Sequence, residues 1–349
     1  MRVDFSLLEG GYLRDLLDQP RALRDTVACL GETRTLSAVT RDLERGVFRR
    51  VVLTGMGSSF HALHPLFLAL NKAGLTALMV ETSELVHSVP ELLDSGTLLV
   101  AVSQSGRSVE LMRLLALRDA FRIIGVTNTS DSPLAQRADA TVLTEAGEEY
   151  TVSCKTYVAG LAALAWLSDV LCGGNRHQVT AEITEAASLA EAYLANWREH
   201  VCTLCEEMKS VRHLFLVGRG ESLATAGTGG LILKESARIH AEGMSSAAFR
   251  HGPFELISGG GVCAVVFDGN DAIAVLNERL AEDVRQAGGQ AILIGSGACI
   301  DACRLARGPN AVRPILEFLP VEMMSLALAF LSNHRPGSFG LASKVTTVE

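Results

Sequence analysis

One separation along the chain, 163 residues, joins two pairs of similar segments. The segment Leu-Thr-Gly-Met-Gly-Ser-Ser at 53–59 returns as Leu-Val-Gly-Arg-Gly-Glu-Ser at 216–222. The same separation aligns residues 100–106 with residues 263–269. Because two distant matches at one separation are rare by chance, the sequence indicates a duplication. The 349 residues are then two copies of one folding unit, which meet near residues 173–210.

Each half alternates short apolar runs, rich in β-branched residues, with segments of helical period. Such runs are typical of buried parallel strands, and their alternation with helices is typical of βαβ units. We therefore predict the α/β class, with two similar doubly wound domains in tandem. Each has a mostly parallel sheet between two layers of helices (αβα). The predicted strands are 50–54, 98–102, 123–127, 213–217, 262–267 and 291–294, and the predicted helices include 59–73, 109–119 and 152–171.

The pattern divides the chain into five segments. Residues 1–48 form an N-terminal helical segment, and residues 49–175 form the first α/β domain, which ends after a Gly-Gly pair. Residues 176–210 are rich in Ala, Leu and Glu and are predicted to be a helical linker. Residues 211–335 form the second α/β domain, and residues 336–349 form a C-terminal tail.

Composition excludes several classes of partner. Lys and Arg total 31 against 39 Asp and Glu, a net charge of −8, and aromatic residues are 5%. Neither a basic patch nor a set of stacking platforms is available, so we expect no nucleic acid partner. The most apolar segment, 158–167, is shorter than the roughly 20 residues of a membrane span. The first residues do not resemble a signal peptide, so we expect a cytoplasmic protein without a membrane partner.

We also expect neither a metal nor a cofactor. The eight cysteines include isolated pairs at 202 and 205 and at 299 and 303, without a histidine at a useful spacing, whereas zinc needs four converging ligands. The turn that begins at Gly55 is similar to a dinucleotide-binding loop. It has Phe60 in place of the third glycine, so a nicotinamide site is a weak prediction.

A loop rich in hydroxyl groups is the first chemical signal. The segment Ser103–Ser108 begins where a predicted strand ends and a helix begins. Its hydroxyls lie beside helix N–H groups, and Gly106 allows a tetrahedral oxyanion to approach, either a phosphate or a sulfonate. Ser58 and Ser59 offer the same chemistry from the neighbouring loop. One serine at such a place is an ordinary N-cap, but five across two loops favour an anion site.

The second copy differs at this point. By the repeat, Val-Phe-Asp-Gly at 266–269 is the equivalent of Ser-Gln-Ser-Gly at 103–106. It has no hydroxyl group, and it carries an acid that repels phosphate. We therefore predict one anion site, in the first domain.

The second half carries an acid and a base of catalytic type. Residues 231–242 have a helical period and place Glu235 among apolar residues, and His251 precedes a Gly-Pro turn that fixes its backbone. A carboxylate and an imidazole near a sugar can move protons between adjacent carbons and open a ring. Two other interpretations stay open: Glu235 pairs with Arg238 on a solvated face, and His251 caps a turn.

These residues resemble a known family. The chain is similar to proteins with tandem SIS (sugar isomerase) domains, among them the isomerase half of glucosamine-6-phosphate synthase, aminosugar-phosphate deaminases and Amadori-phosphate deglycases. The resemblance covers nearly the whole chain, and the order of its short motifs makes it specific. The motifs are Gly57–Phe60, Ser103–Gly106, Thr127-Asn128, Asp131–Leu134, Ser153–Lys155, Lys234-Glu235, Ile239–Glu242, His251–Pro253 and Lys344–Thr346.

The resemblance implies a role for each site residue. Glu235 is implied to be the base that moves a proton between C1 and C2 through an enediol or enolamine. His251, contributed by the neighbouring subunit of a homodimer, is implied to assist ring opening. Lys344, on the tail that reaches the active site, is implied to contact the oxygen end of the substrate, and Ser153 the sugar. The implied phosphate ligands are Ser58, Ser59, Ser103, Gln104, Ser105 and Ser108.

Two departures from the synthase pattern narrow the expected reaction. The synthase has an N-terminal glutaminase domain, for which we expect no room in a chain that starts Met-Arg-Val. It also has a lysine three residues before the catalytic glutamate, where this chain has Ile232. Deglycase-type relatives lack that lysine too, which favours a deglycase or an aldose–ketose isomerase over an amino-transferring enzyme.

We therefore predict an enzyme that acts at C1–C2 of a phosphorylated, amino-substituted hexose. It is an aldose–ketose isomerase, a deaminase or a deglycase. The alternatives are a regulatory protein that only binds a sugar phosphate and an isomerase of a sulfonated sugar.

Overall fold

The computed structural model describes residues 5–118, 121–306, 308–341, 344 and 346. The chain divides into two compact units, each assembled from segments that are distant in sequence. The five-stranded unit comprises Arg21–Glu148, Lys155–Thr184 and Leu341–Glu349. The four-stranded unit comprises Met1–Pro20, Glu149–Cys154 and Glu185–Gly340.

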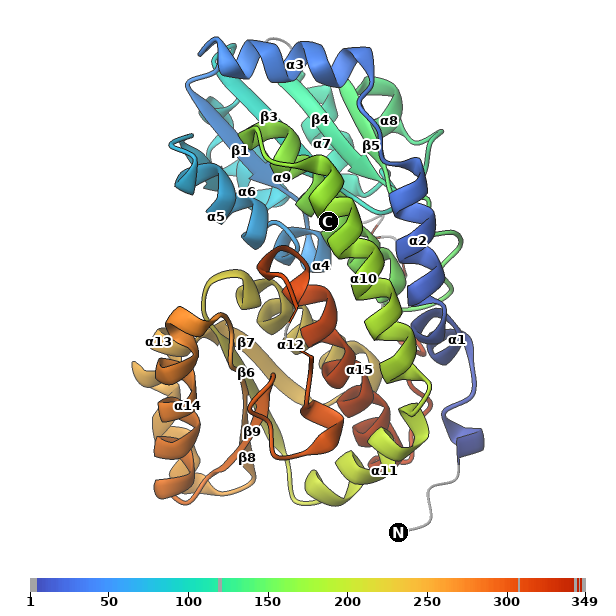
Figure 1. Cartoon of the computed structure of the whole chain (residues 1–349), viewed down its shortest axis with the longest axis vertical. Coiled ribbons are helices and arrows are strands. Elements are labelled where there is room, and N and C mark those ends of the chain that lie inside the picture. Colours follow the sequence, from blue (N-terminus) through green and yellow to red (C-terminus); the bar gives the residue numbers. More distant parts are fainter. Residues whose placement is uncertain (1–4, 119–120, 307, 342–343, 345, 347–349) are drawn as a thin grey trace. The chain divides into compact units, whose positions relative to one another are not determined.

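The five-stranded unit is built on a parallel sheet with the strand order β2-β1-β3-β4-β5. The chain enters near the middle of the sheet, winds to one edge and then to the other. This order creates a switch point between β1 and β3, where ligands of such sheets bind. The strands, labelled in Figure 1, are β1 (Arg50–Thr54), β2 (Ala77–Met79), β3 (Thr97–Val102), β4 (Arg122–Thr127) and β5 (Ala140–Leu143).

Helices cover both faces of this sheet (Figure 1). On one face, Leu85 of α6 and Leu114 of α7 pack with strand residues Val52, Leu99 and Ile123. On the other face, α5 and α9 contact each other. The helices of this unit are α3 (Arg34–Glu44), α4 (Gly57–His61), α5 (His64–Lys72), α6 (Thr82–His87), η2 (Pro90–Leu92), α7 (Val109–Ala116), α8 (Pro133–Arg137) and α9 (Lys155–Cys172), with α2 (Gln19–Cys29) and α10 (Arg176–Leu194) crossing its boundaries.

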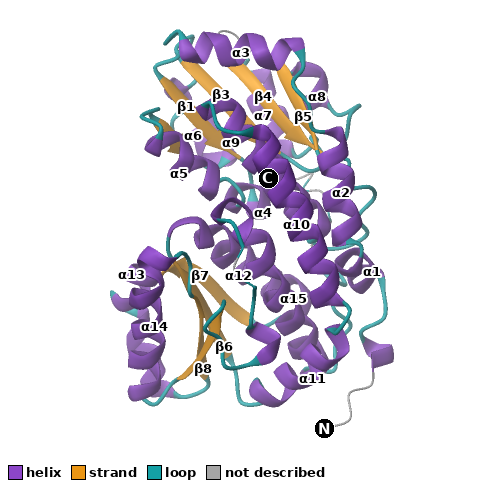
Figure 2. Ribbon diagram, in the orientation of Figure 1, coloured by secondary structure: helices purple, strands orange, loops and turns teal. Residues whose placement is uncertain are grey.

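The four-stranded unit repeats the same winding with one strand fewer. Its parallel sheet has the order β7-β6-β8-β9, which corresponds to β2-β1-β3-β4. Figure 2 shows each sheet flanked by helices. The predicted pair of doubly wound α/β domains is therefore confirmed. The strands are β6 (His213–Gly218), β7 (His240–Ser245), β8 (Val262–Phe267) and β9 (Gln290–Ile294).

The core of this unit also has two faces. Phe215 of β6 and Val266 of β8 pack against Phe249 of α13 and Leu280 of α14. On the opposite face, α12 and α11 both contact α15 (Figure 1). The helices of this unit are η1 (Phe5–Leu7), α1 (Gly11–Leu17), α11 (Trp197–Glu207), η3 (Gly220–Ser222), α12 (Leu223–Ala237), α13 (Ser246–Arg250), η4 (Pro253–Gly259), α14 (Asp271–Gln286), η5 (Asp301–Cys303), η6 (Asn310–Val312) and α15 (Arg313–Leu331).

The six predicted strands are present, each within one residue of its predicted ends. The predicted helix 59–73 is two helices, α4 and α5, and the one predicted at 152–171 begins at Lys155. The helix predicted at 109–119 ends at Ala116, and Asp119 lies outside the described residues. Strands β2, β5 and β7 were not predicted.

The predicted helical stretch 231–242 is wrong in its second half. Helix α12 ends at Ala237, Arg238 adopts a left-handed conformation with φ 53°, and β7 begins at His240. The strand forms because it pairs with β6 along its whole length, and pairing of this kind overrides local helical period. His240 and Glu242 therefore lie on one face of a strand, with His240 Nε2 3.3 Å from Glu242 Oε1.

The register of the repeat also needs a correction. Strands β1 and β6 begin 163 residues apart, as the sequence match predicts, but β3 and β8 end at Val102 and Phe267, which are 165 residues apart. The residue that follows β8 in the position of Ser103 is therefore Asp268, not Val266. The sequence alignment failed because the starts of the first and third strands lie 47 residues apart in the first copy (97 − 50) and 49 in the second (262 − 213).

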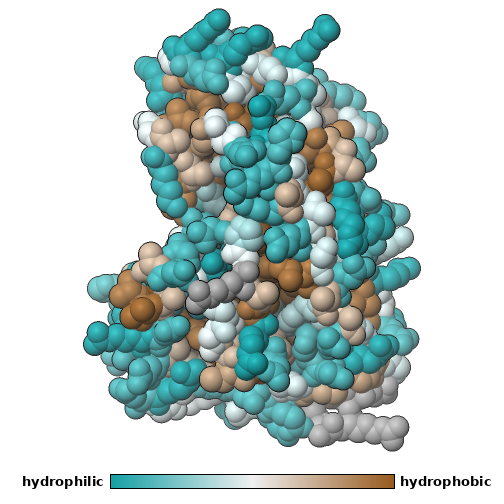
Figure 3. Space-filling model, in the orientation of Figure 1, coloured by the Kyte–Doolittle hydropathy of each residue, from teal (hydrophilic) through white to brown (hydrophobic). Residues whose placement is uncertain are grey.

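Two segments are long and apolar enough to cross a membrane by composition alone. They are Lys155–Cys172 and Asn310–Leu331, and 83% and 89% of their apolar windows are buried inside the structure. Figure 3 shows that hydrophilic residues dominate the visible surface, with apolar residues in small separate groups. Core helices of soluble proteins have the same composition and burial, so these segments are weak evidence for a membrane span.

Candidate functional site

The hydroxyl loop, Ser103–Ser108, follows β3 and leads into α7. Ser108 is the N-cap of α7, and its Oγ accepts a hydrogen bond from the Leu111 N–H at 3.4 Å. Ser103 Oγ accepts from the Gly106 N–H at 3.1 Å, and Ser105 Oγ accepts from the Arg107 N–H at 3.3 Å. Each hydroxyl thus uses a lone pair locally, while its O–H remains a donor. Three such donors beside a helix start suit an oxyanion.

The backbone of the hydroxyl loop is held against β4. The Gln104 carbonyl oxygen accepts from the Asn128 N–H at 3.1 Å and from Thr127 Oγ1 at 3.2 Å. Gly106 has φ +62°, and a side chain there would collide with Ser132. These contacts fix the hydroxyl groups in one arrangement. This favours anion binding because the loop loses little conformational entropy when an anion binds.

Ser58 and Ser59 lie in the first turn of α4, directly after β1. Strands β1 and β3 are adjacent and parallel, so their carboxyl ends meet at the same edge of the sheet. The two serines and the hydroxyl loop therefore lie on the two sides of the switch point between these strands. Both serines are half-buried.

The C-terminal segment reaches the start of α7. The Thr346 carbonyl oxygen accepts a hydrogen bond from the Val109 N–H at 3.2 Å. Lys344, two residues earlier and half-buried, belongs to the same unit. The fold thus brings the predicted tail lysine into the neighbourhood of the hydroxyl loop, and Thr346 occupies one of the N–H groups that the sequence offers to an anion.

Glu235 lies on α12 in the four-stranded unit, two residues before the helix ends. Its side chain is half-buried, and burial raises the pKa of its carboxyl to about 6, with a further increase from the charge of Glu149 and a decrease from Lys234. A carboxyl group with a pKa near 6 is poised to accept and return a proton near neutral pH.

The interpretation of Glu235 as half of a solvated ion pair is not supported. The Arg238 guanidinium instead donates to the Ser338 carbonyl oxygen at 3.4 Å, and in the described part of the chain no ion pair joins Arg238 to Glu235. The left-handed backbone of Arg238 turns the chain away after the last turn of α12. Glu235 therefore keeps a carboxylate without a partner arginine.

His251 is exposed at the end of α13 and forms its C-cap position. Its backbone N–H donates to the Ala248 carbonyl oxygen at 3.0 Å, and η4 begins at Pro253. Among the described residues, no hydrogen bond or ion pair joins the His251 and Glu235 side chains. His251 is thus available to another molecule, while its backbone also closes a turn as the alternative interpretation predicts.

Ser153 lies in the short segment Glu149–Cys154 of the four-stranded unit. In the same segment, the buried Glu149 accepts a hydrogen bond from the Cys154 N–H at 3.0 Å through Oε1. Glu149 is the group that raises the pKa of Glu235 electrostatically, and sequence reasoning missed it. The only available signal was its position a few residues before Ser153.

A comparison with protein families finds a match to the SIS domain over residues 48–168. Residues 48–168 of this chain therefore match a SIS domain. The matched SIS domain contains the sheet of the five-stranded unit, Ser58, Ser59, the hydroxyl loop and Ser153. Glu235, His251 and Lys344 lie beyond the matched residues.

Curated relatives are similar to this chain over almost its whole length. The glutamine–fructose-6-phosphate aminotransferase (isomerizing) of Pyrococcus horikoshii is 29% identical over 98% of this chain and 59% of its own length. The chain thus spans about three fifths of the length of the curated relatives it matches.

Solved structures support the same fold. The C-terminal domain of glucosamine-fructose-6-phosphate aminotransferase from Francisella tularensis has a TM-score of 0.83 at 23% identity, over 94% of this chain and 98% of that one. Glucosamine-6-phosphate deaminase from Thermotoga maritima has a TM-score of 0.77 at 17% identity, over 97% of this chain and 100% of that one. At these identities the SIS fold is shared, and the reaction has to be argued from the site.

Proposed function

We propose that this SIS-domain protein is an enzyme that moves a proton between C1 and C2 of a phosphorylated, amino-substituted hexose. The observation that carries the proposal is the Glu235 carboxyl, half-buried and without a partner arginine, with a pKa raised by burial to about 6. The named relatives act on fructose-6-phosphate or glucosamine-6-phosphate, which suggests a hexose 6-phosphate.

In the proposed mechanism, the hydroxyl loop, including the side chain of Gln104, together with Ser58 and Ser59 binds the phosphate. His251 assists ring opening. The Glu235 carboxylate then takes the proton from C2 of the open aldose, the C–H electron pair forms the C1–C2 double bond, and the carbonyl oxygen at C1 is protonated. Return of the proton to C1, with loss of a proton from the substituent at C2, gives a ketose where C2 carries a hydroxyl group and a ketimine where it carries an amine. Lys344 contacts the oxygen end of the open chain, and Ser153 contacts the sugar.

Three outcomes share this step: isomerisation, deamination and deglycation. The position three residues before Glu235 holds Ile232, which is buried in the core, so α12 offers no ammonium group there. This favours a deglycase or an aldose–ketose isomerase over amino transfer.

We also propose a cytoplasmic homodimer in which His251 is shared between subunits, without a nucleic acid or membrane partner. His251 is exposed, and Leu256 on the η4 helix that follows it is 56% exposed. An exposed imidazole beside an exposed apolar side chain suits a surface that a second copy covers.

A substrate panel tests the proposal. Aldose and ketose phosphates, Amadori phosphates and sulfonated sugars are offered, and ammonia, amino acid and isomer release are followed together. Glu235→Gln should lower kcat by about a thousandfold or more with little change in sugar-phosphate binding, since it removes only the base. Glu282→Gln, an exposed carboxylate change on α14, is the control.

Unchanged turnover in Glu235→Gln contradicts the assignment. Thermal stabilisation by hexosamine phosphates without any product would instead indicate a regulatory sugar-phosphate-binding protein. Turnover of sulfonated sugars alone would assign the hydroxyl loop to a sulfonate.

A further inference from the structure

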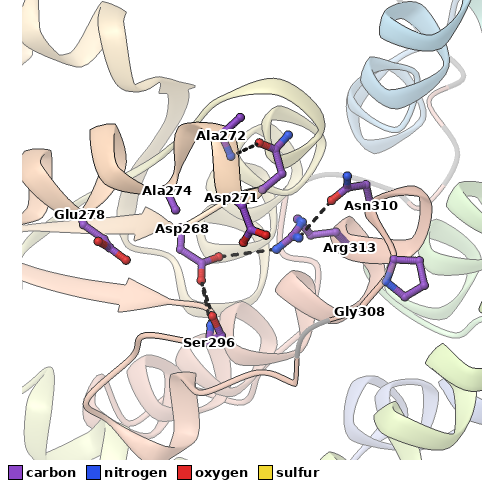
Figure 4. A pocket seen from close by; sticks show the side chains of 12 residues that line it. Asp268, Asp271, Ala272, Ala274, Glu278, Ser296, Gly308, Asn310 and Arg313 are labelled. Atoms are coloured by element: carbon purple, nitrogen blue, oxygen red, sulfur yellow. Dashed lines mark hydrogen bonds and ion pairs between the residues drawn. The ribbon is translucent and has the colours of Figure 1, made fainter.

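The four-stranded unit contains a cavity that the proposed function does not use. It has a volume of about 510 Å³ and lies where β8 and β9 end, beside the first turns of α14 and α15 (Figure 4). Small-molecule sites have volumes of roughly 300–1,000 Å³ and occur at this edge of parallel sheets. Its polar lining includes Asp268, Asn270, Glu278, Ser296, Asn310 and Arg313.

Asp268 is a buried carboxylate with an unused acceptor. It is 5% exposed, and its Oδ2 accepts from the Ser296 N–H at 2.8 Å. Its Oδ1 forms an ion pair with Arg313 Nη1 at 3.7 Å but accepts no hydrogen bond within the described part of the chain. A buried carboxylate oxygen of this kind costs free energy until a donor reaches it, so it favours a ligand that carries one.

Arg313 presents the complementary group on the same cavity. Its Nη2 donates to Asn310 Oδ1 at 3.1 Å, whereas its Nε is buried and has no hydrogen-bond partner among the described residues. Figure 4 shows the Asp268 carboxylate joined to Arg313 on one side and to Ser296 on the other. The ion pair of Asp268 and Arg313 thus keeps one donor and one acceptor that make no hydrogen bond among the described residues, and a hydroxyl group can serve either because it donates and accepts at once.

The charge of the lining selects against an anion. Asp268, Asp271 and Glu278 oppose the single described cation Arg313, an excess of two negative charges. In the five-stranded unit, the residue in the place of Asp268 is Ser103 of the hydroxyl loop. The two copies therefore favour ligands of opposite charge at the same strand end. The hydroxyl loop suits a phosphate, whereas the acids of the cavity repel a phosphate and attract an ammonium group.

A metal ion does not fit this lining. Among the described residues, no group of three or more His, Cys, Asp or Glu side chains is placed to hold a metal. The cavity is also much larger than a single ion.

We propose that this cavity binds a polyhydroxylated amine, a small ligand with several hydroxyl groups, one ammonium group and no anionic group. Its hydroxyls contact Asp268 and Arg313, and Glu278 on the exposed side of α14 attracts the ammonium. The site is separate from the proposed sugar-phosphate chemistry and does not rest on it.

Calorimetric titration of the full chain tests each part of this chemistry with four probes. Glucosamine carries both an ammonium group and several hydroxyl groups. Glucose lacks the ammonium group, putrescine lacks the hydroxyl groups, and glucosamine 6-phosphate adds an anionic group. Glucosamine should bind about tenfold more tightly than glucose or putrescine. Equal affinity of glucosamine and glucose, or no glucosamine binding at all, overturns the proposal.

Variants locate the binding site. Asp268→Asn keeps the bond from Ser296 and removes the free acceptor, and it should weaken glucosamine binding by about tenfold or more. Glu278→Gln, an exposed change that leaves the core intact, should weaken it about threefold and leave glucose binding unaltered. Glu282→Gln lies on the same helix outside the lining and should have no effect. The contrast between Glu278→Gln and Glu282→Gln tests the location of the site even if Asp268→Asn fails to fold.

A last variant distinguishes binding in the cavity from binding at the hydroxyl loop. The double change Ser103→Ala and Ser105→Ala should abolish the binding of glucosamine 6-phosphate and leave glucosamine binding unchanged. Loss of glucosamine binding in this variant would place the ligand at the hydroxyl loop and overturn the second site, whatever the fate of the proposed enzyme activity.

Discussion

The pKa of the Glu235 carboxyl sets an expected pH dependence. The proposed base acts only when it is deprotonated, and burial holds its pKa at about 6. Below that pH, kcat/KM should fall by about tenfold per pH unit, and above about pH 7 it should reach a plateau. The measurement is the pH profile of kcat/KM with the substrate that the panel identifies. A profile flat from pH 5 to 8 would assign the proton transfer to another group.

Two neighbours of Glu235 shift this profile in opposite directions. Glu149→Gln removes a negative charge and keeps the hydrogen bond from the Cys154 N–H, so the acid limb should move to lower pH. Lys234→Gln removes a positive charge and should move it to higher pH. Each shift should be roughly a few tenths of a pH unit. Shifts of the same sign would show that Glu235 is not the titrating group.

At the scale of the element, the hydroxyl loop depends on Gly106. Gly106→Ala forces φ +62° on a residue with a side chain and drives that side chain into Ser132. The loop has to shift, so inorganic phosphate should bind about tenfold more weakly or worse, at a stability cost of about 1–3 kcal/mol.

Gly46→Ala is the matched control for Gly106→Ala. It has a similar φ of +73°, and a side chain there meets nothing within 4 Å. It should lose about 1 kcal/mol from backbone strain and keep phosphate binding intact. Equal loss of phosphate binding in both variants would mean that the hydroxyl loop is not the anion site. Calorimetry with phosphate and thermal unfolding measure both quantities.

Helix α12, which carries Glu235, is fitted closely to β7. A Cβ on Gly230 would lie 2.6 Å from the Gly243 backbone nitrogen. Gly230→Ala should therefore lower the free energy of unfolding by about 2–3 kcal/mol and lower kcat by displacing the helix. In α9, Gly160 meets nothing within 4 Å, so Gly160→Ala should stabilise the protein by about 0.5–1 kcal/mol through helix propensity. Denaturant titration of both variants tests this contrast, and stabilisation by Gly230→Ala would contradict it.

The same close fit shows where prediction from sequence stops. Six apolar strands were predictable because burial on both faces leaves a continuous hydrophobic run. The fit of β7 against α12 depends on the close approach of Gly243 in the strand to Gly230 in the helix, which a single sequence does not reveal. The polar residues of β7 also match a helical period equally well. The hydroxyl loop was predictable from its serines, whereas Glu149 and the cavity beside Asp268 depend on contacts between segments that are distant in sequence.

At the scale of the whole molecule, the duplication has preserved the strand order of the two sheets and changed the loops that follow their strands. Both sheets run in the order that creates a switch point, yet one carries hydroxyl groups after its third strand and the other carries Asp268. Strand pairing constrains the buried residues of each copy, while loop residues at the carboxyl edge are free to diverge. The duplicated fold thus provides two places for ligands, and the net charge of −8 does not decide what either one binds.

The proposed sharing of His251 predicts complementation between inactive chains. Glu235→Gln and His251→Asn should each be inactive alone. In a mixed dimer, one site combines Glu235 of one chain with His251 of the other and is intact, while the second site lacks both groups. Since half of the dimers are mixed after random exchange, an equimolar mixture should regain about a quarter of the wild-type activity.

The complementation experiment needs subunit exchange, which mild denaturation and refolding of the mixture provides, and the refolded wild-type protein sets the full activity. If His251 acts within its own chain, every site in the mixture lacks one catalytic group and no activity returns. A fully active monomer in sedimentation would also contradict the sharing of His251 between subunits. Recovery of about a quarter of the activity would instead make the dimer a requirement of the chemistry, because each exposed His251 then completes the site of its neighbour.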